Sequence, residues 1–253
     1  MNKYIKNLNR IEVIETLACT GRCKHCSEGD HARFTEHLDG KIATKAIDDI
    51  CRVYKIDSLM VFGGEPLLYP EDVCEIFKAG KKAGIQRQDL ITNGYFSKDE
   101  KRIQEVANHL VENGLNRILL SVDAFHQETI PIEPVMAFAK YIQNVGIKTE
   151  LSPAWLVSKE DNNPYNIKTR EILKLFTDIG FGLGTGNVIW PEGNARIYLK
   201  DYFDLSKEYA NPYEDDPRDL KSISIESNGN VLNGNIYQNN IIEILESYRL
   251  FRE

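Results

Sequence analysis

The chain has 253 residues, of which 42% are hydrophobic, so it is long enough for one large domain with a buried core. Its formal net charge is −7 and no cluster of five Lys or Arg residues occurs, which argues against nucleic acid as a partner. No apolar run is long enough to cross a membrane, and the polar first ten residues lack the apolar stretch of a signal peptide, so we expect a cytoplasmic protein with no membrane partner.

The first three quarters of the chain alternate between strand and helix patterns. Short apolar runs, typical of parallel strands buried on both faces, predict strands at Ile11–Thr16, Ser58–Gly63, Asp89–Thr92, Arg117–Val122, Lys148–Ser152 and Phe181–Ile189. Helical patterns between them begin at Ala43, Pro70, Ser97, Ile132 and Thr169. The first reaches Tyr54, and the other four are stopped by Gly84, Gly114, Gly146 and Gly180. This repeated order predicts an α/β fold with a parallel sheet, and the number of units favours a partial (β/α)6-type barrel over a closed eight-stranded one.

The sequence changes character near its end, so we divide the chain into a barrel at residues 1–196 and a C-terminal tail at residues 197–253. Asn228-Gly229 is a turn signal between two short strand patterns, which predicts a β-hairpin followed by a helix. The tail contains, in order, an acidic loop at Asn211–Asp219, strands at Lys221–Glu226 and Asn230–Leu232, and a short amphipathic helix at Asn240–Tyr248.

Three of the five cysteines, Cys19, Cys23 and Cys26, are clustered directly after the first predicted strand. An odd number of cysteines in a chain expected in the cytoplasm argues against a disulfide framework and favours a metal site. Three thiolates on one loop can hold three irons of a [4Fe–4S] cluster and leave the fourth iron open. The alternative is a zinc site in which His25 or His31 supplies the fourth ligand.

The Cys-x3-Cys-x2-Cys spacing resembles the signature of the radical S-adenosylmethionine (SAM) superfamily, and the resemblance covers roughly residues 11–196. It implies that SAM chelates the open iron. Reductive cleavage of SAM then gives a 5′-deoxyadenosyl radical, which abstracts a hydrogen atom from a substrate. His25 stands before the third cysteine, where the family usually places an aromatic residue near the adenine. The resemblance also implies a low-potential electron donor such as flavodoxin or ferredoxin.

Segments at the carboxyl ends of the later strands resemble the family's SAM contacts. Gly63-Gly64-Glu65-Pro66 looks like the GGEP motif, in which glycines allow a close approach and a carboxylate accepts from the SAM ammonium. All these segments fall at one edge of a parallel sheet, where ligand sites are built. The other cofactor-binding residues that the resemblance implies are Thr92, Asn93, Ser121, Asp123 and Val188.

Two residues are predicted to act on the substrate side. His126, just beyond the fourth strand, can donate a hydrogen bond or move a proton, although an ordinary exposed histidine is the alternative. Glu150, on the fifth strand, is expected to face the barrel interior, where it contacts SAM or substrate or pairs with Arg196. Cys51 and Cys74 fall at helical positions and are expected to be buried apolar residues.

Residues 222–237 resemble the start of the extension that carries auxiliary clusters in relatives that modify peptides. No cysteine follows Cys74, so we predict a degenerate extension without a second cluster. The substrate class that we favour is a peptide or protein side chain. The alternatives are a glycyl-radical-enzyme activase, a small-molecule radical enzyme, and a non-catalytic iron–sulfur or zinc protein that binds a partner.

Overall fold

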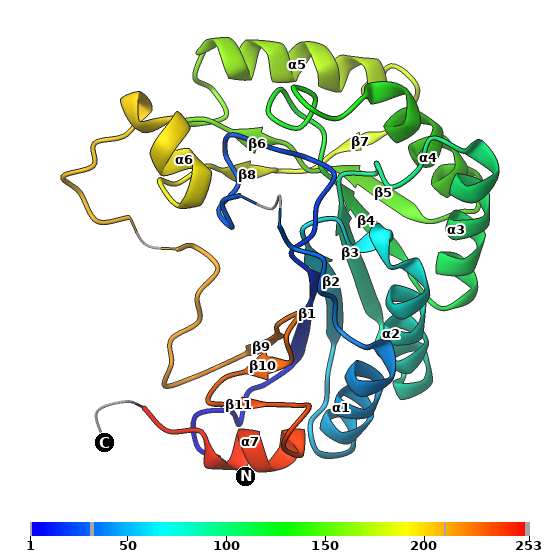
Figure 1. The fold of residues 1–253 in the computed structure, drawn as a ribbon, viewed down its shortest axis with the longest axis vertical. Coiled ribbons are helices and arrows are strands. Elements are labelled where there is room, and N and C mark those ends of the chain that lie inside the picture. Colours follow the sequence, from blue (N-terminus) through cyan, green and yellow to red (C-terminus); the bar gives the residue numbers. More distant parts are fainter. Residues whose placement is uncertain (1, 31–32, 210, 251–253) are drawn as a thin grey trace.

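The computed structural model describes residues 2–30, 33–209 and 211–250, and a curved sheet of seven strands forms its centre. Figure 1 shows the sheet with helices along its convex side. Each pair of neighbouring strands is parallel, in the order β7-β5-β4-β3-β2-β1-β9. The strands are β1 (Arg10–Thr16), β2 (Ser58–Gly63), β3 (Arg87–Thr92), β4 (Arg117–Leu120), β5 (Lys148–Leu151), β7 (Gly182–Leu183) and β9 (Ser222–Ile225).

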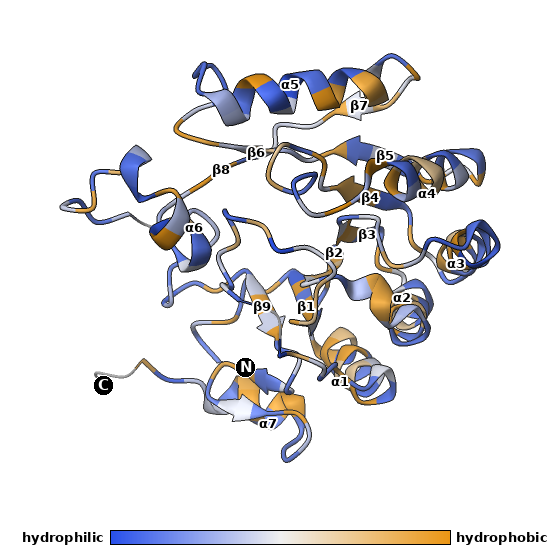
Figure 2. Cartoon of the chain, turned by 45° about the horizontal axis from the view of Figure 1, so that its top comes forward, coloured by the Kyte–Doolittle hydropathy of each residue, from blue (hydrophilic) through white to orange (hydrophobic). Residues whose placement is uncertain are grey.

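Five helices connect the strands and bury their apolar faces against the sheet, as Figure 2 shows by hydropathy. In α1, for example, Ala43, Ile47 and Ile50 are fully buried. This arrangement confirms the predicted α/β partial barrel. The helices are α1 (Gly40–Val53), α2 (Pro70–Ala83), α3 (Glu100–Glu112), α4 (Ile132–Asn144) and α5 (Pro164–Thr177).

Three helices begin elsewhere than the sequence patterns predicted, and α1 begins at Gly40 rather than Ala43 because the Asp39 side chain caps it. α3 begins after Asp99, whose side chain accepts from Lys101 N, so the cap is not Ser97. α5 begins at Pro164, earlier than the predicted Thr169, because the Asn163 side chain caps it. Asn163-Pro164 is itself a helix-start signal, and the apolar periodicity alone did not include it.

The predicted strand Phe181–Ile189 is wrong, because it is two short strands with different partners. β7 pairs with β5, whereas β8 (Asn187–Val188) pairs with β6 (Ala154–Trp155) in a separate two-stranded sheet. Gly186 lies between the two strands at φ +68°, and a Cβ atom there would collide with the Pro153 carbonyl oxygen. The glycine therefore turns the chain onto a second partner strand.

The predicted tail hairpin is also only partly present. β9 pairs with β1 and so extends the main sheet, while β10 (Asn230–Val231) pairs antiparallel with β11 (Gly234–Asn235). The predicted turn exists, since Gly229 N donates to the Glu226 carbonyl at 2.8 Å. It joins two different sheets, however, because β1 offers β9 an open edge of the main sheet. The remaining helices are α6 (Gly193–Tyr198) and α7 (Ile241–Ser247), with 3₁₀ turns η1 (Pro66–Leu68) and η2 (Lys200–Tyr202).

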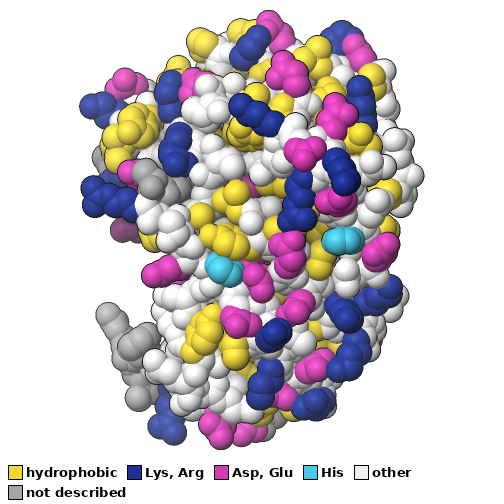
Figure 3. Space-filling model, turned by 45° about the vertical axis from the view of Figure 1, so that its right-hand side comes forward, with side chains coloured by type: hydrophobic (Ala, Val, Ile, Leu, Met, Phe, Trp, Pro, Cys, Tyr) yellow, Lys and Arg dark blue, Asp and Glu magenta, His cyan; other side chains and the backbone are white. Residues whose placement is uncertain are grey.

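The outer face of the molecule mixes both signs of charge. In Figure 3, Lys and Arg are interspersed with Asp and Glu over the visible face, and hydrophobic side chains are scattered among them. Within the described ranges, no helix combines the length and the apolar character that a membrane crossing would need.

Candidate functional site

A cavity of about 230 Å³ lies at the carboxyl edge of the sheet, beside the loop that follows β1. It brings together most of the residues that the sequence singled out. Four of the predicted site residues, Glu65, Pro66, Asp123 and Glu150, are outside its lining. The predicted residues that line it are Cys19, Cys23, His25, Cys26, Gly63, Gly64, Thr92, Asn93, Ser121, His126 and Val188.

The three thiols of the cysteine loop all face this cavity. Tight turns arrange them, since Cys26 N donates to the Cys23 carbonyl at 3.2 Å and Gly21 N donates to Cys19 Sγ at 3.3 Å. Burial raises the pKa of Cys19 to about 11, and it raises the pKa of Cys23 and of Cys26 as well. Thiols of this kind become thiolate ligands only when a metal supplies the compensating positive charge.

The spacing of these sulfur atoms suits a cluster better than a single ion. Among the described residues, the sulfur atoms of Cys19, Cys23 and Cys26 do not all lie within 4.8 Å of one another. A single zinc ion draws its ligands close together, whereas an iron–sulfur cube spreads them over separate irons. The three cysteines therefore fit a [4Fe–4S] cluster. His31, one of the two histidines named for the zinc alternative, lies outside the described residues.

Gly63 and Gly64 allow the end of β2 to approach the cysteine loop. Gly64 N donates to the Thr16 carbonyl at 2.7 Å, and Gly63 has a φ of +135°. A Cβ atom on Gly63 would collide with Thr16 O, and one on Gly64 would collide with Ala18 O. Only glycines fit this close approach, and it exposes their backbone to the cavity.

Glu65 turns away from the cavity and joins the ends of β2 and β3. Its fully buried carboxylate accepts from Leu67 N at 2.9 Å, Thr92 Oγ1 at 2.7 Å and Asn93 N at 2.8 Å. Burial raises the pKa of Glu65 to about 7, although these three donors oppose the shift. The sequence led us to expect this carboxylate to meet the SAM ammonium. In the structure it supports the neighbouring loops, and Pro66 is buried beside it.

The ends of β3, β4 and β5 supply small polar groups to the cavity. Asn93 Nδ2 lies 3.2 Å from Thr20 Oγ1 and 3.6 Å from Cys19 Sγ, so it links the β3 end to the cysteine loop. Ser121 and Ser152 directly follow β4 and β5 and line the cavity beside it. These groups can donate hydrogen bonds to a polar ligand held above the cysteines.

Asp123 lies behind the cavity and holds the loop that carries His126. Its fully buried carboxylate accepts from the backbone N–H groups of Phe125, His126 and Ala154, and lies 2.8 Å from His126 Nδ1. Burial favours a higher pKa for Asp123, but His126 and these donors keep it well below its usual range. Asp123 thus positions His126, and it lies outside the cavity lining.

His25 is packed between aromatic groups at the cavity wall. Its ring centroid lies 5.1 Å from that of Phe125 and 4.9 Å from that of His126. Burial lowers the pKa of His25 to about 4, and the neighbouring His126 acts in the same direction. His25 is therefore a neutral, flat group at neutral pH, which suits the side of a planar ligand.

Glu150 does not reach the cavity. Its carboxylate pairs with Lys148 Nζ at 2.6 Å and with Arg117 Nη2 at 2.8 Å, and not with Arg196 as the sequence suggested. Lys148 and Arg117 hold the pKa of Glu150 below its usual range. We therefore assign no catalytic step to Glu150.

Asn194 is a supporting residue that the sequence analysis did not identify. Its backbone N–H donates to the Cys26 carbonyl at 2.8 Å, and its Nδ2 donates to the carbonyls of Cys23 at 3.0 Å and Gly29 at 3.2 Å. The start of α6 thereby holds the cysteine loop from a distant part of the chain. Gly193 permits the contact, because a Cβ atom there would collide with the Ser27 carbonyl.

Comparison with known proteins agrees with this arrangement. The family described as the Radical SAM superfamily matches residues 13–154. A probable GTP 3′,8-cyclase of Saccharolobus solfataricus is 28% identical over 214 residues, which are 81% of this chain and 65% of that protein. The chain thus spans slightly less than two thirds of that relative's length.

Solved structures share the fold. The chain is similar to anSMEcpe with bound AdoMet, with a TM-score of 0.59 and 16% identity, over 94% of this chain and 80% of that one. It is also similar to SuiB of Streptococcus suis bound to the precursor peptide SuiA, with a TM-score of 0.58 and 13% identity, over 97% and 68% of the two chains. At these identities the likeness shows the fold alone.

Proposed function

The chain belongs to the radical SAM superfamily, and we propose that it cleaves SAM reductively and modifies a substrate held at the same cavity. Enzymes of this family use a [4Fe–4S] cluster and SAM, and the bound cluster supplies the electron that breaks the C5′–S bond and releases a 5′-deoxyadenosyl radical. The observation that carries the proposal is that three thiols and the ends of β2 to β5 open into one cavity.

Different residues of the cavity would hold the cluster, face SAM and exclude water. Cys19, Cys23 and Cys26 would hold three irons, and the exposed backbone of Gly63 and Gly64 would face the SAM methionine group. The apolar wall of the cavity would limit the access of water to the radical. It is formed by Ile14, Leu17, Phe62, Ile91, Val188 and Ile189.

For the substrate, we propose a peptide or protein side chain, and for the reductant a low-potential protein such as flavodoxin or ferredoxin. The likeness of residues 222–237 to the extension of peptide-modifying relatives supports the substrate class. His126 at the cavity wall, fixed by Asp123, is the group that we propose to hydrogen-bond to the substrate.

A second candidate is a small-molecule reaction on a purine nucleotide. The 28% identity to a probable GTP 3′,8-cyclase over 214 residues supports it. The two candidates differ in which added compound raises the turnover of SAM.

The test is the formation of 5′-deoxyadenosine by anaerobically reconstituted protein with SAM and dithionite. We expect the product to form, and we expect Cys23→Ala to abolish both the product and the cluster iron. Cys51→Ala and Cys74→Ala are matched controls, because these two thiols lie in α1 and α2, away from the cysteine loop. Both variants should keep four irons per chain, the content of one [4Fe–4S] cluster. A sound cluster without any 5′-deoxyadenosine, even with candidate substrates present, would contradict the proposal and favour a binding role.

The same assay separates the substrate classes. If GTP raises 5′-deoxyadenosine formation and is itself converted, the nucleotide reaction is correct and the peptide class is wrong. If GTP has no effect while peptide fractions stimulate turnover, the peptide class gains its support.

A further inference from the structure

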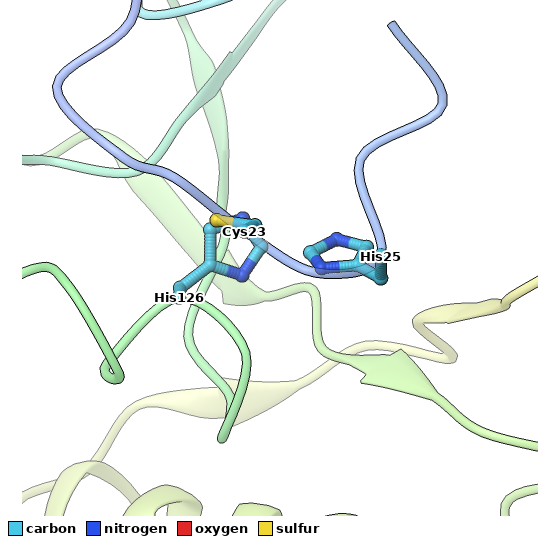
Figure 4. Close-up of side chains that lie close together, drawn as sticks. All are labelled: Cys23, His25 and His126. Atoms are coloured by element: carbon cyan, nitrogen blue, oxygen red, sulfur yellow. The ribbon is translucent and has the colours of Figure 1, made fainter. Parts of the chain in front are cut away.

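Three potential metal ligands meet beside the cavity in a combination that the cluster does not use. Cys23, His25 and His126 each offer a ligand atom, and these atoms all lie within 4.8 Å of one another. Figure 4 shows that they come from two loops, with Cys23 and His25 on the loop after β1 and His126 on the loop after β4. The fold, rather than local sequence spacing, brings them together.

The surroundings of the two histidines favour metal binding. Asp123 Oδ2 lies 2.8 Å from His126 Nδ1, so the Nε2 atom is the one directed away from the carboxylate. A carboxylate behind a histidine is the usual support of a metal-bound imidazole. In the part of the chain that the structure describes, His25 Nδ1 is buried without a hydrogen-bond partner. A buried nitrogen of this kind is stabilised by a metal ion as well as by a donor.

We propose that Cys23, His25 and His126 bind a single divalent transition-metal ion such as Zn²⁺, and that this site competes with the iron–sulfur cluster because both require Cys23. One thiolate, two imidazoles and a water form a tetrahedral set of the kind that zinc accepts. Tetrahedral zinc needs ligand atoms roughly 3.3–3.8 Å apart, so small side-chain rotations from the present spacing suffice.

The proposed competition rests on the cluster assignment above, whereas the metal binding does not. Zinc uptake releases the thiol proton of Cys23 and leaves Cys19 and Cys26 unused. A chain that takes up zinc first therefore lacks one of the three cluster ligands. The two metals should exclude each other on the same chain.

The test uses the full chain, prepared without oxygen and freed of metal by a chelator. Titration with Zn²⁺ against a colorimetric indicator, followed by metal analysis, should give one zinc per chain. Co²⁺ is the spectroscopic probe, since it should show the charge-transfer band of a thiolate and the visible bands of tetrahedral coordination. Zinc-loaded protein should then assemble no cluster until the zinc is removed.

Variants separate this site from the cluster. His25→Phe keeps a ring against Phe125, and His126→Gln keeps a polar group near Asp123, yet each should weaken Zn²⁺ binding at least about tenfold. Both should still assemble the cluster. Cys19→Ala and Cys26→Ala should lose the cluster and keep the zinc site, and Cys23→Ala should lose both.

Two results would overturn the inference. The first is Zn²⁺ affinity that His25→Phe and His126→Gln leave unchanged. The second is Zn²⁺ binding that depends on Cys19 or Cys26, because zinc would then use the cluster thiols. A third result would refute the proposed function but not the zinc site. In that case the parent chain assembles no cluster, while Cys19→Ala still binds zinc.

Discussion

Glu15 has a fully buried carboxyl group near the end of β1, and neither of its oxygens has a hydrogen-bond partner among the described residues. Burial raises the pKa of Glu15 to about 9, and the nearby carboxylates of Asp72 and Asp39 act in the same direction. At neutral pH this carboxyl therefore stays protonated in the folded chain and ionises when the chain unfolds. Glu15 should therefore make the stability of the protein depend on pH.

The sign and size of the effect follow from the two pKa values. Between the usual value of 4.5 and the folded value of about 9, the folded state holds one more proton than the unfolded state. The favourable contribution of neutral Glu15 is thus complete below 4.5 and is lost as the pH rises through 9. The contribution of Glu15 to the free energy of unfolding should fall by up to about 1.4 kcal/mol per pH unit in this window, or about 3 kcal/mol between pH 6 and 8.5.

Glu15→Gln removes the ionisation while keeping the size of the side chain. We expect the variant to gain stability relative to the parent as the pH rises, measured by urea unfolding of the reconstituted protein at pH 6 and 8.5. Glu12→Gln is the matched control on the opposite face of β1, where Arg10 pairs with Glu12 at 2.7 Å. Its change should stay below about 1 kcal/mol at both pH values. A difference between Glu15→Gln and the parent that does not vary with pH would refute the reasoning.

Two further predictions concern residues that support the cavity. Glu65→Ala leaves the donors of Leu67, Thr92 and Asn93 without an acceptor, so it should lower the free energy of unfolding by about 1–3 kcal/mol and weaken SAM binding while the iron content stays unchanged. Unaltered SAM affinity in a titration would contradict this. Asn194→Ala removes two hydrogen bonds to the cysteine loop and should shorten the half-life of the cluster in a chelator, and an unchanged half-life would show that the contact is dispensable.

The sequence predicted those features that depend on local pattern. The cysteine spacing, the glycine pair and the polar strand ends are each contained in a few residues, and parallel strands bring their carboxyl ends to one edge whatever the details of packing. The role of Asn194 was not predictable in this way, because the Cys23 carbonyl that it contacts lies 171 positions away. The support that Glu65 and Asp123 give to neighbouring loops was not predictable for a related reason. The sequence pattern of a carboxylate at a strand end is the same whether the carboxylate faces a ligand or accepts hydrogen bonds from backbone N–H groups of a neighbouring loop.

Glu150 shows what a strand pattern leaves undetermined. A period of two placed Glu150 and Ser152 on the same face of the predicted strand Lys148–Ser152, and Ser152 does line the cavity. The pattern does not fix how deep in the barrel each residue lies. Glu150 pairs in register with Leu119. It therefore lies nearer than Ser152 to the amino ends of the strands, where Arg117 forms an ion pair with it. Glu150 and Ser152 are two positions apart, which is about 6.6 Å along an extended strand. That distance is enough for Ser152 to line the cavity while Glu150 forms an ion pair below it. Depth therefore has to come from the register between strands, which becomes known only once the sheet is assembled.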